Sequence, residues 1–222
     1  MRDWLIVEIA PQKKKRDRVN VYFSDFVLGI SLFLLTKHGL TAGDKLSEKK
    51  LVAFWKEEIE ERTTNKALFL LSYRPRSEKE MEQRLKMYLK KSEPTLKKAP
   101  YFLQIKTNQV IKKVIGILKK RKLIDDCEFA AWWCEQRARF RPRSLLQLRM
   151  ELGGKGISKE IIDEALLKSG YDEEKMAKKL VEKKLSGLKG EGKEKRLIAY
   201  LTRKGFSYKL VKSLIDEKRS LA

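Results

Sequence analysis

Apolar and polar positions alternate along the first 45 or so residues, whereas apolar residues recur every three or four positions in most of the remaining chain. Alternation is typical of strands with one buried face, and the second spacing is typical of amphipathic helices. A turn at Ser24-Asp25 joins two alternating segments into a hairpin, and a short helix begins at Ser31 and ends near Gly39. Strands are predicted over residues 4–9, 19–23 and 26–30.

The chain is predicted to be helical again from Ser47 onward, and no convincing strand follows Thr63. The first long helix carries four large apolar residues on one face, Leu51, Phe54, Trp55 and Ile59. Beyond it the tetrapeptide Arg-Pro-Arg-Ser occurs twice, at residues 74–77 and 141–144, an offset of 67. A fainter third copy lies a further 49 residues on, and that offset takes Gly156 onto Gly205. Self-similarity of this kind indicates a helical repeat protein.

Each copy is interpreted as a unit of three helices. The fold class is therefore mainly α, an elongated and curved array of three tandem three-helix repeats after a small N-terminal segment that contains a β-hairpin. The predicted division is an N-terminal β-containing extension with a linking helix over 1–62, and repeats over 63–124, 125–169 and 170–222. The predicted helices are 67–74, 78–90, 109–120, 128–140, 145–152, 159–168, 173–185, 193–204 and 208–218. An insertion at about 92–106 is either a loop or a short additional element.

The proline and the serine of the repeated tetrapeptide have a structural role. Proline ends the preceding helix, and Ser77 and Ser144 each stand three residues before a Glu or Gln, which is the spacing of a capping box. The arginines are not needed for this role. Arg74, Arg76, Arg141 and Arg143 are therefore expected on exposed corners, where guanidinium groups can reach phosphates or carboxylates.

The net charge of the chain is a second reason to expect that those arginines bind an anionic partner. The 222 residues contain 52 Lys and Arg against 30 Asp and Glu, a formal charge of +22. Such a charge opposes compaction and favours a polyanionic partner, nucleic acid above all, although a generally solvated basic surface would also produce it. The run Lys13 to Arg18 is expected to be a loop, either solvated or in contact with nucleic acid.

The densest arginine segment lies around the second tetrapeptide. Five arginines fall between residues 137 and 149, namely Arg137, Arg139, Arg141, Arg143 and Arg149. Trp132 and Trp133 precede them and point about 100° apart on a helix, so we expect one to be buried and the other to cover a neighbouring unit or stack on a base. The helices that follow share no base-reading residues, which favours sequence-independent contact.

Catalysis is not indicated. The single histidine, His38, precedes Gly39 at an expected helix end, and the glycines near 153–156 follow a helical pattern without the residues of a phosphate loop. Cys127 and Cys134 lack a second pair of metal ligands and are expected to pack in the core. Two cysteines, no apolar run long enough to span a bilayer and no readable signal peptide indicate a cytoplasmic protein.

Residues 63–218 resemble the RecX family, the bacterial regulators of the RecA recombinase. The resemblance rests on Ala67 to Ser77, Leu123 to Ala130, the second Arg-Pro-Arg-Ser with Leu148 to Leu152, and Lys155-Gly156-Ile157 with Ile161-Ile162. The N-terminal β segment is similar to an extension that some members carry. The first repeat departs from the family pattern, since Leu89-Lys90-Lys91 replaces the usual glycine and an insertion follows.

The resemblance implies a non-enzymatic regulator, in most cases an inhibitor, that binds RecA and its filament on single-stranded DNA and modulates filament extension, ATP hydrolysis and strand exchange. We also expect no cofactor, non-specific electrostatic contact with DNA, no membrane partner and a monomer. The alternative is a basic nucleic-acid-binding structural protein without a dedicated protein partner. The predicted binding residues are Arg74, Arg76, Arg84, Arg137, Arg139, Arg141, Arg143, Arg149, Lys155, Arg196, Arg203 and Lys204.

Overall fold

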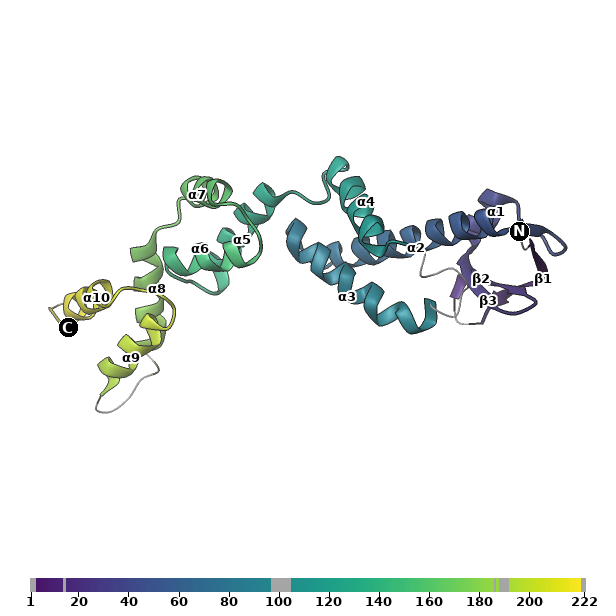
Figure 1. Ribbon diagram of the computed structural model, residues 1–222. Coiled ribbons are helices and arrows are strands. Elements are labelled where there is room, and N and C mark those ends of the chain that lie inside the picture. The colour runs from purple at the N-terminus through teal and green to yellow at the C-terminus, as the bar shows by residue number, and fades with distance from the viewer. Residues whose placement is uncertain (1–2, 14, 97–104, 186, 188–191, 221–222) are drawn as a thin grey trace. The chain divides into compact units, whose positions relative to one another are not determined.

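The computed structural model describes residues 3–13, 15–96, 105–185, 187 and 192–220. The described chain is mainly helical, with a small β-sheet at its N-terminal end, as the sequence predicted (Figure 1). Its residues divide into two compact units. The first unit is Met1–Arg74 with Met81–Leu123, and the second is Pro75–Glu80 with Ile124–Ala222. The division into an extension and three repeats remains a prediction.

The sheet of the first unit is antiparallel in the order β3-β2-β1-β4. Its strands are β1 (Asp3–Gln12), β2 (Lys15–Phe23), β3 (Val27–Ser31) and β4 (Lys45–Ser47). Val19, Val21 and Phe23 alternate into the core, and Val21 pairs with Ile9 on β1 and Leu28 on β3. The hairpin of β2 and β3 is confirmed.

One prediction about this sheet was wrong, and one strand was missed. The basic run after Lys13 is not a loop, because Lys15 to Arg18 form the first half of β2. The short strand β4 was not predicted, because three residues are too few to show alternation. β1 also extends past Pro11, and this is possible because β4 pairs only with the opposite end of β1.

The helices of the first unit are α1 (Leu32–His38), α2 (Glu48–Leu71), α3 (Glu78–Leu96) and α4 (Thr107–Lys120). α1 is capped by Ser31, where the helix was predicted to begin, and it ends at Gly39, whose φ of 59° is left-handed. The helix predicted over residues 67–74 is not separate, since α2 runs unbroken to Leu71 with no Gly or Pro in it. The four predicted apolar residues of α2 are all buried.

The insertion predicted at about 92–106 is partly helical. α3 continues to Leu96, because no glycine stops it where the family pattern has one. Residues 97–104 lie outside the described residues, and α4 follows at Thr107.

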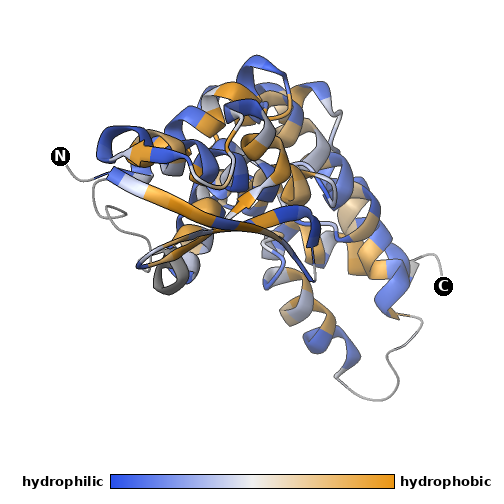
Figure 2. Ribbon diagram, turned by 90° about the vertical axis from the view of Figure 1, so that its right-hand side faces the viewer, coloured by the Kyte–Doolittle hydropathy of each residue, from blue (hydrophilic) through white to orange (hydrophobic). Residues whose placement is uncertain are grey.

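Among its described residues from Ile124 onward, the second unit contains six helices whose bounds lie close to the predicted ones. They are α5 (Asp126–Phe140), α6 (Leu145–Gly154), α7 (Lys159–Lys168), α8 (Glu173–Leu185), α9 (Lys193–Thr202) and α10 (Tyr208–Ser220). Helices α5–α7 share one core around Phe129, and α8–α10 share another around Phe206. Apolar and polar segments alternate along these ribbons, as expected of amphipathic helices (Figure 2). Within the described part of the chain, no helix is long and apolar enough to cross a membrane.

Candidate nucleic-acid interface

Each Arg-Pro-Arg-Ser corner lies against a Lys-Gly turn from later in the chain. Ser77 Oγ accepts a hydrogen bond from Glu80 N at 3.2 Å, as its predicted capping role requires, and donates to the carbonyl oxygen of Lys155 at 2.8 Å. Ser144 Oγ caps Gln147 N at 3.0 Å, while Ser144 N donates to the carbonyl oxygen of Lys204 at 3.1 Å. Both copies of the motif are thus docked on the carbonyl of a Lys-Gly turn, through the serine hydroxyl in the first copy and the serine N–H in the second.

Glycine is required at both turns. Gly156 and Gly205 have φ values of 86° and 92°, in the region that other residues rarely adopt. A Cβ on Gly156 would lie 2.5 Å from Lys79 Cδ, and one on Gly205 would collide with the capping Ser144. The offset of 49 that relates these glycines in the sequence therefore marks two equivalent docking turns.

The second corner is held by a tyrosine from the segment before α8. The Tyr171 hydroxyl donates to the carbonyl oxygen of Arg143 at 2.8 Å and accepts from Arg143 N at 3.1 Å. Burial raises the pKa of this phenol, so the hydroxyl keeps its proton at neutral pH. The backbone of the corner is consequently fixed from both sides, by Tyr171 and by the turn at Lys204.

A single carboxylate organises the side chains around this corner. Glu151 on α6 accepts from Arg137 Nε at 2.7 Å and from Trp133 Nε1 at 3.0 Å, and it lies 3.6 Å from Arg143 Nε. The guanidinium of Arg137 also stacks over the Trp133 ring at 4.4 Å. These contacts restrict the rotamers of the arginines, so less conformational entropy is lost when they bind a ligand.

Further cations surround the same carboxylate. The pKa of Lys204 is lowered, first by burial and then by repulsion from Arg143, Arg141 and Arg137. Arg141 is exposed, and its guanidinium makes no hydrogen bond or ion pair with any described residue. We call Arg137, Arg141, Arg143 and Lys204 with Glu151 the Glu151 cluster. Four cations with one acid leave this site with a net positive charge, which favours the binding of an anion.

Lys155 lies at the edge of the Glu151 cluster. Its ammonium group is 5.6 Å from the centre of the Trp133 ring and 3.3 Å from Glu80 Oε2. Lys155 therefore connects the docked first corner to the aromatic side of the cluster.

The tryptophan prediction was wrong in part. Trp132 and Trp133 are both partly buried against the same core, with ring centres 5.9 Å and 5.7 Å from that of Phe129. Large indole rings can reach round a helix to a shared neighbour even when their Cα–Cβ bonds diverge. Trp133 stacks against the guanidinium of Arg137, a role that the sequence pattern did not indicate.

Arg76 corrects another expectation. Its side chain is not on an exposed corner but is only 9% exposed, in an ion pair with the buried Glu80. The i, i+4 spacing of the two residues allows this pairing once the helix begins at Glu78. A buried guanidinium that already has a carboxylate partner is a structural group, and its phosphate-binding role is not supported.

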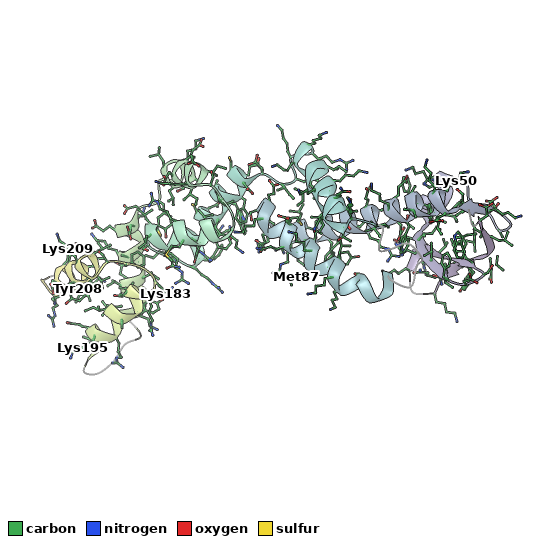
Figure 3. The ribbon with its side chains drawn as sticks, viewed as in Figure 1. Lys50, Met87, Lys183, Lys195, Tyr208 and Lys209 are labelled. Atoms are coloured by element: carbon green, nitrogen blue, oxygen red, sulfur yellow. The ribbon has the colours of Figure 1, made fainter. Side chains whose placement is uncertain are left out.

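The other predicted residues are not brought into the Glu151 cluster by any described contact. Arg149 donates from Nε and Nη2 to Asp163 Oδ1 on α7, at 3.1 Å each, and Arg139 stacks over the Phe140 ring at 5.1 Å. Arg74 is half-buried and Arg84 is exposed, both in the first unit. Arg196 and Arg203 are exposed in the second unit. Exposed lysines also lie on α8, α9 and α10, including Lys183, Lys195 and Lys209 (Figure 3).

The two cysteines differ in their exposure to solvent. Cys134 is buried as expected, and burial raises the pKa of its thiol to about 11. Cys127 is exposed, which contradicts its predicted place in the core; it lies in the first turn of α5, beside the capping Asp125. Among the described residues, no three His, Cys, Asp or Glu side chains are grouped to hold a metal ion.

The chain matches known proteins along most of its length. The family model for the first three-helix domain of RecX matches residues 64–88, and that for the second three-helix domain of RecX matches residues 125–166. A regulatory protein RecX of Bacillus subtilis (strain 168) is 30% identical over 217 residues, covering 96% of this chain and 76% of that protein. One of Clostridioides difficile (strain 630) is 27% identical, covering 96% and 95% of the two chains.

Solved structures support the same fold. A crystal structure of a regulatory protein RecX superimposes with a TM-score of 0.58 at 24% identity, covering 96% of this chain and 99% of that one. A crystal structure of RecX from Lactobacillus salivarius gives a TM-score of 0.50 and covers 72% of this chain. Together with the sequence match to the relatives, these findings show that the chain belongs to the RecX family of regulatory proteins.

Proposed function

We propose that this protein regulates the RecA recombinase by binding the RecA filament on single-stranded DNA, and that its predominant effect is inhibition. Membership of a family of regulatory proteins supports the regulatory role. RecA as the partner, the inhibition of filament extension, ATP hydrolysis and strand exchange, and a cytoplasmic location are parts of the proposal. No catalytic step is needed for it, since a ligand lodged on a filament blocks growth by occupying the site.

The Glu151 cluster is the observation that carries the proposal. Its four cations converge from α5, the Arg-Pro-Arg-Ser corner and the turn after α9, and Arg141 has no partner among the described residues. Guanidinium groups bind phosphate in bidentate geometry, and contacts to phosphate do not depend on sequence. A regulator that follows a filament along any DNA needs contacts of this kind.

The test is RecA ATP hydrolysis on single-stranded DNA, titrated with the protein at fixed moderate salt. We expect inhibition at amounts well below one protein per RecA subunit. The Arg141→Gln variant should need an about tenfold higher concentration for half-inhibition, since a charged hydrogen bond contributes about 1.5–3 kcal/mol. Arg121→Gln removes the same charge from the exposed end of α4, outside the cluster, and should change the titration little.

The outcomes separate the proposal from its alternative. Inhibition that appears only when the DNA is saturated, and that falls equally in both variants, would mean that net charge competes for DNA. The formal charge of +22 supports that second function, a non-specific nucleic-acid-binding protein without a dedicated protein partner. No effect on hydrolysis at any ratio would remove the regulatory proposal.

A further inference from the structure

A second basic site lies in the first unit, far along the sequence from the Glu151 cluster. The structure has a pocket of about 360 Å³ there, between the polar face of the sheet and residues of α2 and α3. It is lined by Gln12, Lys15, Arg18, Asn20, Val27, Gly29, Arg62 and Tyr88. The register places Asn20 opposite Gly29, and strand alternation puts Arg18 and Val27 on the same face as this pair.

Two of the lining arginines surround one buried acid. Glu58 on α2 is 0% exposed, and its Oε1 accepts from Arg18 Nη2 and from Arg62 Nε at 2.5 Å each. The same two guanidiniums donate to the carbonyl oxygen of Gly29, at 2.7 Å from Arg18 and 2.5 Å from Arg62. Ser31 N donates to the second oxygen of Glu58 at 3.1 Å.

The arginines have donors left over after these bonds. Arg18 uses one terminal nitrogen for both of its acceptors, so its Nε and Nη1 make no hydrogen bond with any described residue. Arg62 likewise leaves Nη1 without a described partner. Two guanidiniums against one carboxylate leave one positive charge, and it is held in place rather than mobile because both side chains are largely buried.

The rest of the pocket adds charge and polar groups. Lys15 is exposed and its ammonium group has no ion pair within the described residues, so three cations line the pocket and Glu58 pairs with only two of them. Gln12 Nε2 donates to Asn20 Oδ1 at 2.8 Å, across a gap that only glycine leaves open, since a Cβ on Gly29 would lie 2.6 Å from Gln12 Nε2. Tyr88 of α3 contributes an aromatic side chain to the lining.

We propose that this pocket binds a phosphate group, either of the single-stranded nucleic acid backbone or of a free nucleotide. Fixed guanidinium donors, a free ammonium group and amide side chains are the groups that recognise phosphate, and the aromatic ring suits a stacked base. The basic run of β2 thereby gains a role as part of a binding site. This site goes beyond the proposed regulation, because it requires no RecA.

The test is the acetylation of individual lysines, read by mass spectrometry on the full chain, without RecA. Lys50 on α2 is the internal control, since it is exposed and lies outside the pocket (Figure 3). We expect an oligo(dT) strand to protect Lys15 at least threefold more than Lys50. Protection by ATP as strong as by oligo(dT) would identify a free nucleotide as the source, whereas protection by the strand alone would identify the backbone. Equal modification of the two lysines with both ligands would overturn the site.

A matched pair of variants tests the same site without chemical modification. If the pocket binds a backbone phosphate, Lys15→Gln should make oligo(dT) binding less sensitive to salt. The slope of the logarithm of the binding constant against the logarithm of salt concentration should become less negative by about 0.7, the value for one lost phosphate contact on a single strand. For a free nucleotide, the variant should instead weaken ATP binding. Lys50→Gln should do neither, and if the two variants behave alike in both titrations the proposal fails. Because RecA is absent, failure here leaves the RecA test standing, and failure of that test leaves this site standing.

Discussion

At the scale of single residues, the second unit depends on two glycines whose conformations are left-handed. Gly156 and Gly205 have no Cβ, and each lies where an Arg-Pro-Arg-Ser corner meets the turn. The adjacent backbone carbonyls of Lys155 and Lys204 accept hydrogen bonds from the serines at residues 77 and 144. A side chain at either glycine would therefore strain the turn and displace the corner.

The Gly205→Ala variant should lose about 1–3 kcal/mol of unfolding free energy, because alanine opposes a φ of 92° and its Cβ meets Ser144. The measurement is urea denaturation followed by circular dichroism. Gly153→Ala is the matched control, since Gly153 lies in α6 with open space around it and should gain about 0.5–1 kcal/mol. Equal losses in the two variants would contradict the docking role of Gly205.

At this scale, the sequence predicted helix caps correctly but predicted the exposure of some side chains wrongly. The two serines of the tetrapeptide, Ser77 and Ser144, cap their helices as predicted, because a cap depends on residues three positions away. The exposure of Arg76 and Cys127 was predicted wrongly, since burial depends on packing by other parts of the chain. The Glu151 cluster itself joins residues up to 67 positions apart.

At the scale of elements, Glu58 ties α2 to the sheet. Its carboxylate contacts Arg18 on β2 and the backbone of Ser31 at the end of β3, and both arginines around it also bind Gly29. Repeated contact through one buried acid fixes the helix against two strands. The neighbouring Glu57 instead pairs with Lys37 and His38 at the surface, which lowers its pKa chiefly through the hydrogen bond from Lys37.

Glu58→Gln should therefore destabilise the protein by about 3 kcal/mol, near the lower end for a broken buried pair because both arginines keep some contact with water. Glu57→Gln should change the unfolding free energy by less than about 0.5 kcal/mol, as is usual for an exposed pair. Thermal and urea unfolding of both variants would measure the difference. A loss at Glu57 as large as that at Glu58 would rule out the special role of the buried acid.

At the scale of the whole molecule, the chain forms two compact units, and the second of them contains two separate cores. Net positive charge is carried by both units. One basic site is the Glu151 cluster of the second unit, and the other is the pocket of the first unit. Binding through two sites on one chain raises the effective concentration of each, provided that both can reach the same ligand.

Two compact units predict separate local stabilities. Gly205→Ala should speed amide hydrogen exchange in the second unit and leave the sheet amides of Val21 and Ile30 unchanged. Glu58→Gln should do the reverse. Hydrogen exchange followed by mass spectrometry on the full chain gives both patterns at once. Faster exchange across both units in both variants would mean that the chain opens as a single cooperative structure.

The sequence by itself determined the helices of the second unit, the hairpin, the caps and the family, because these depend on spacings within a few residues or on motif order. It also determined a positive charge that needs an anionic partner. Only the tertiary structure decided which arginines are free to bind. Arg76 and Arg143 both follow the proline of the motif but differ in their surroundings, because Glu80 pairs with Arg76 whereas Glu151, 3.6 Å from Arg143, accepts its hydrogen bond from Arg137. The packing of α5 against α6 brings Glu151 to these arginines, and no local pattern in the sequence encodes that packing.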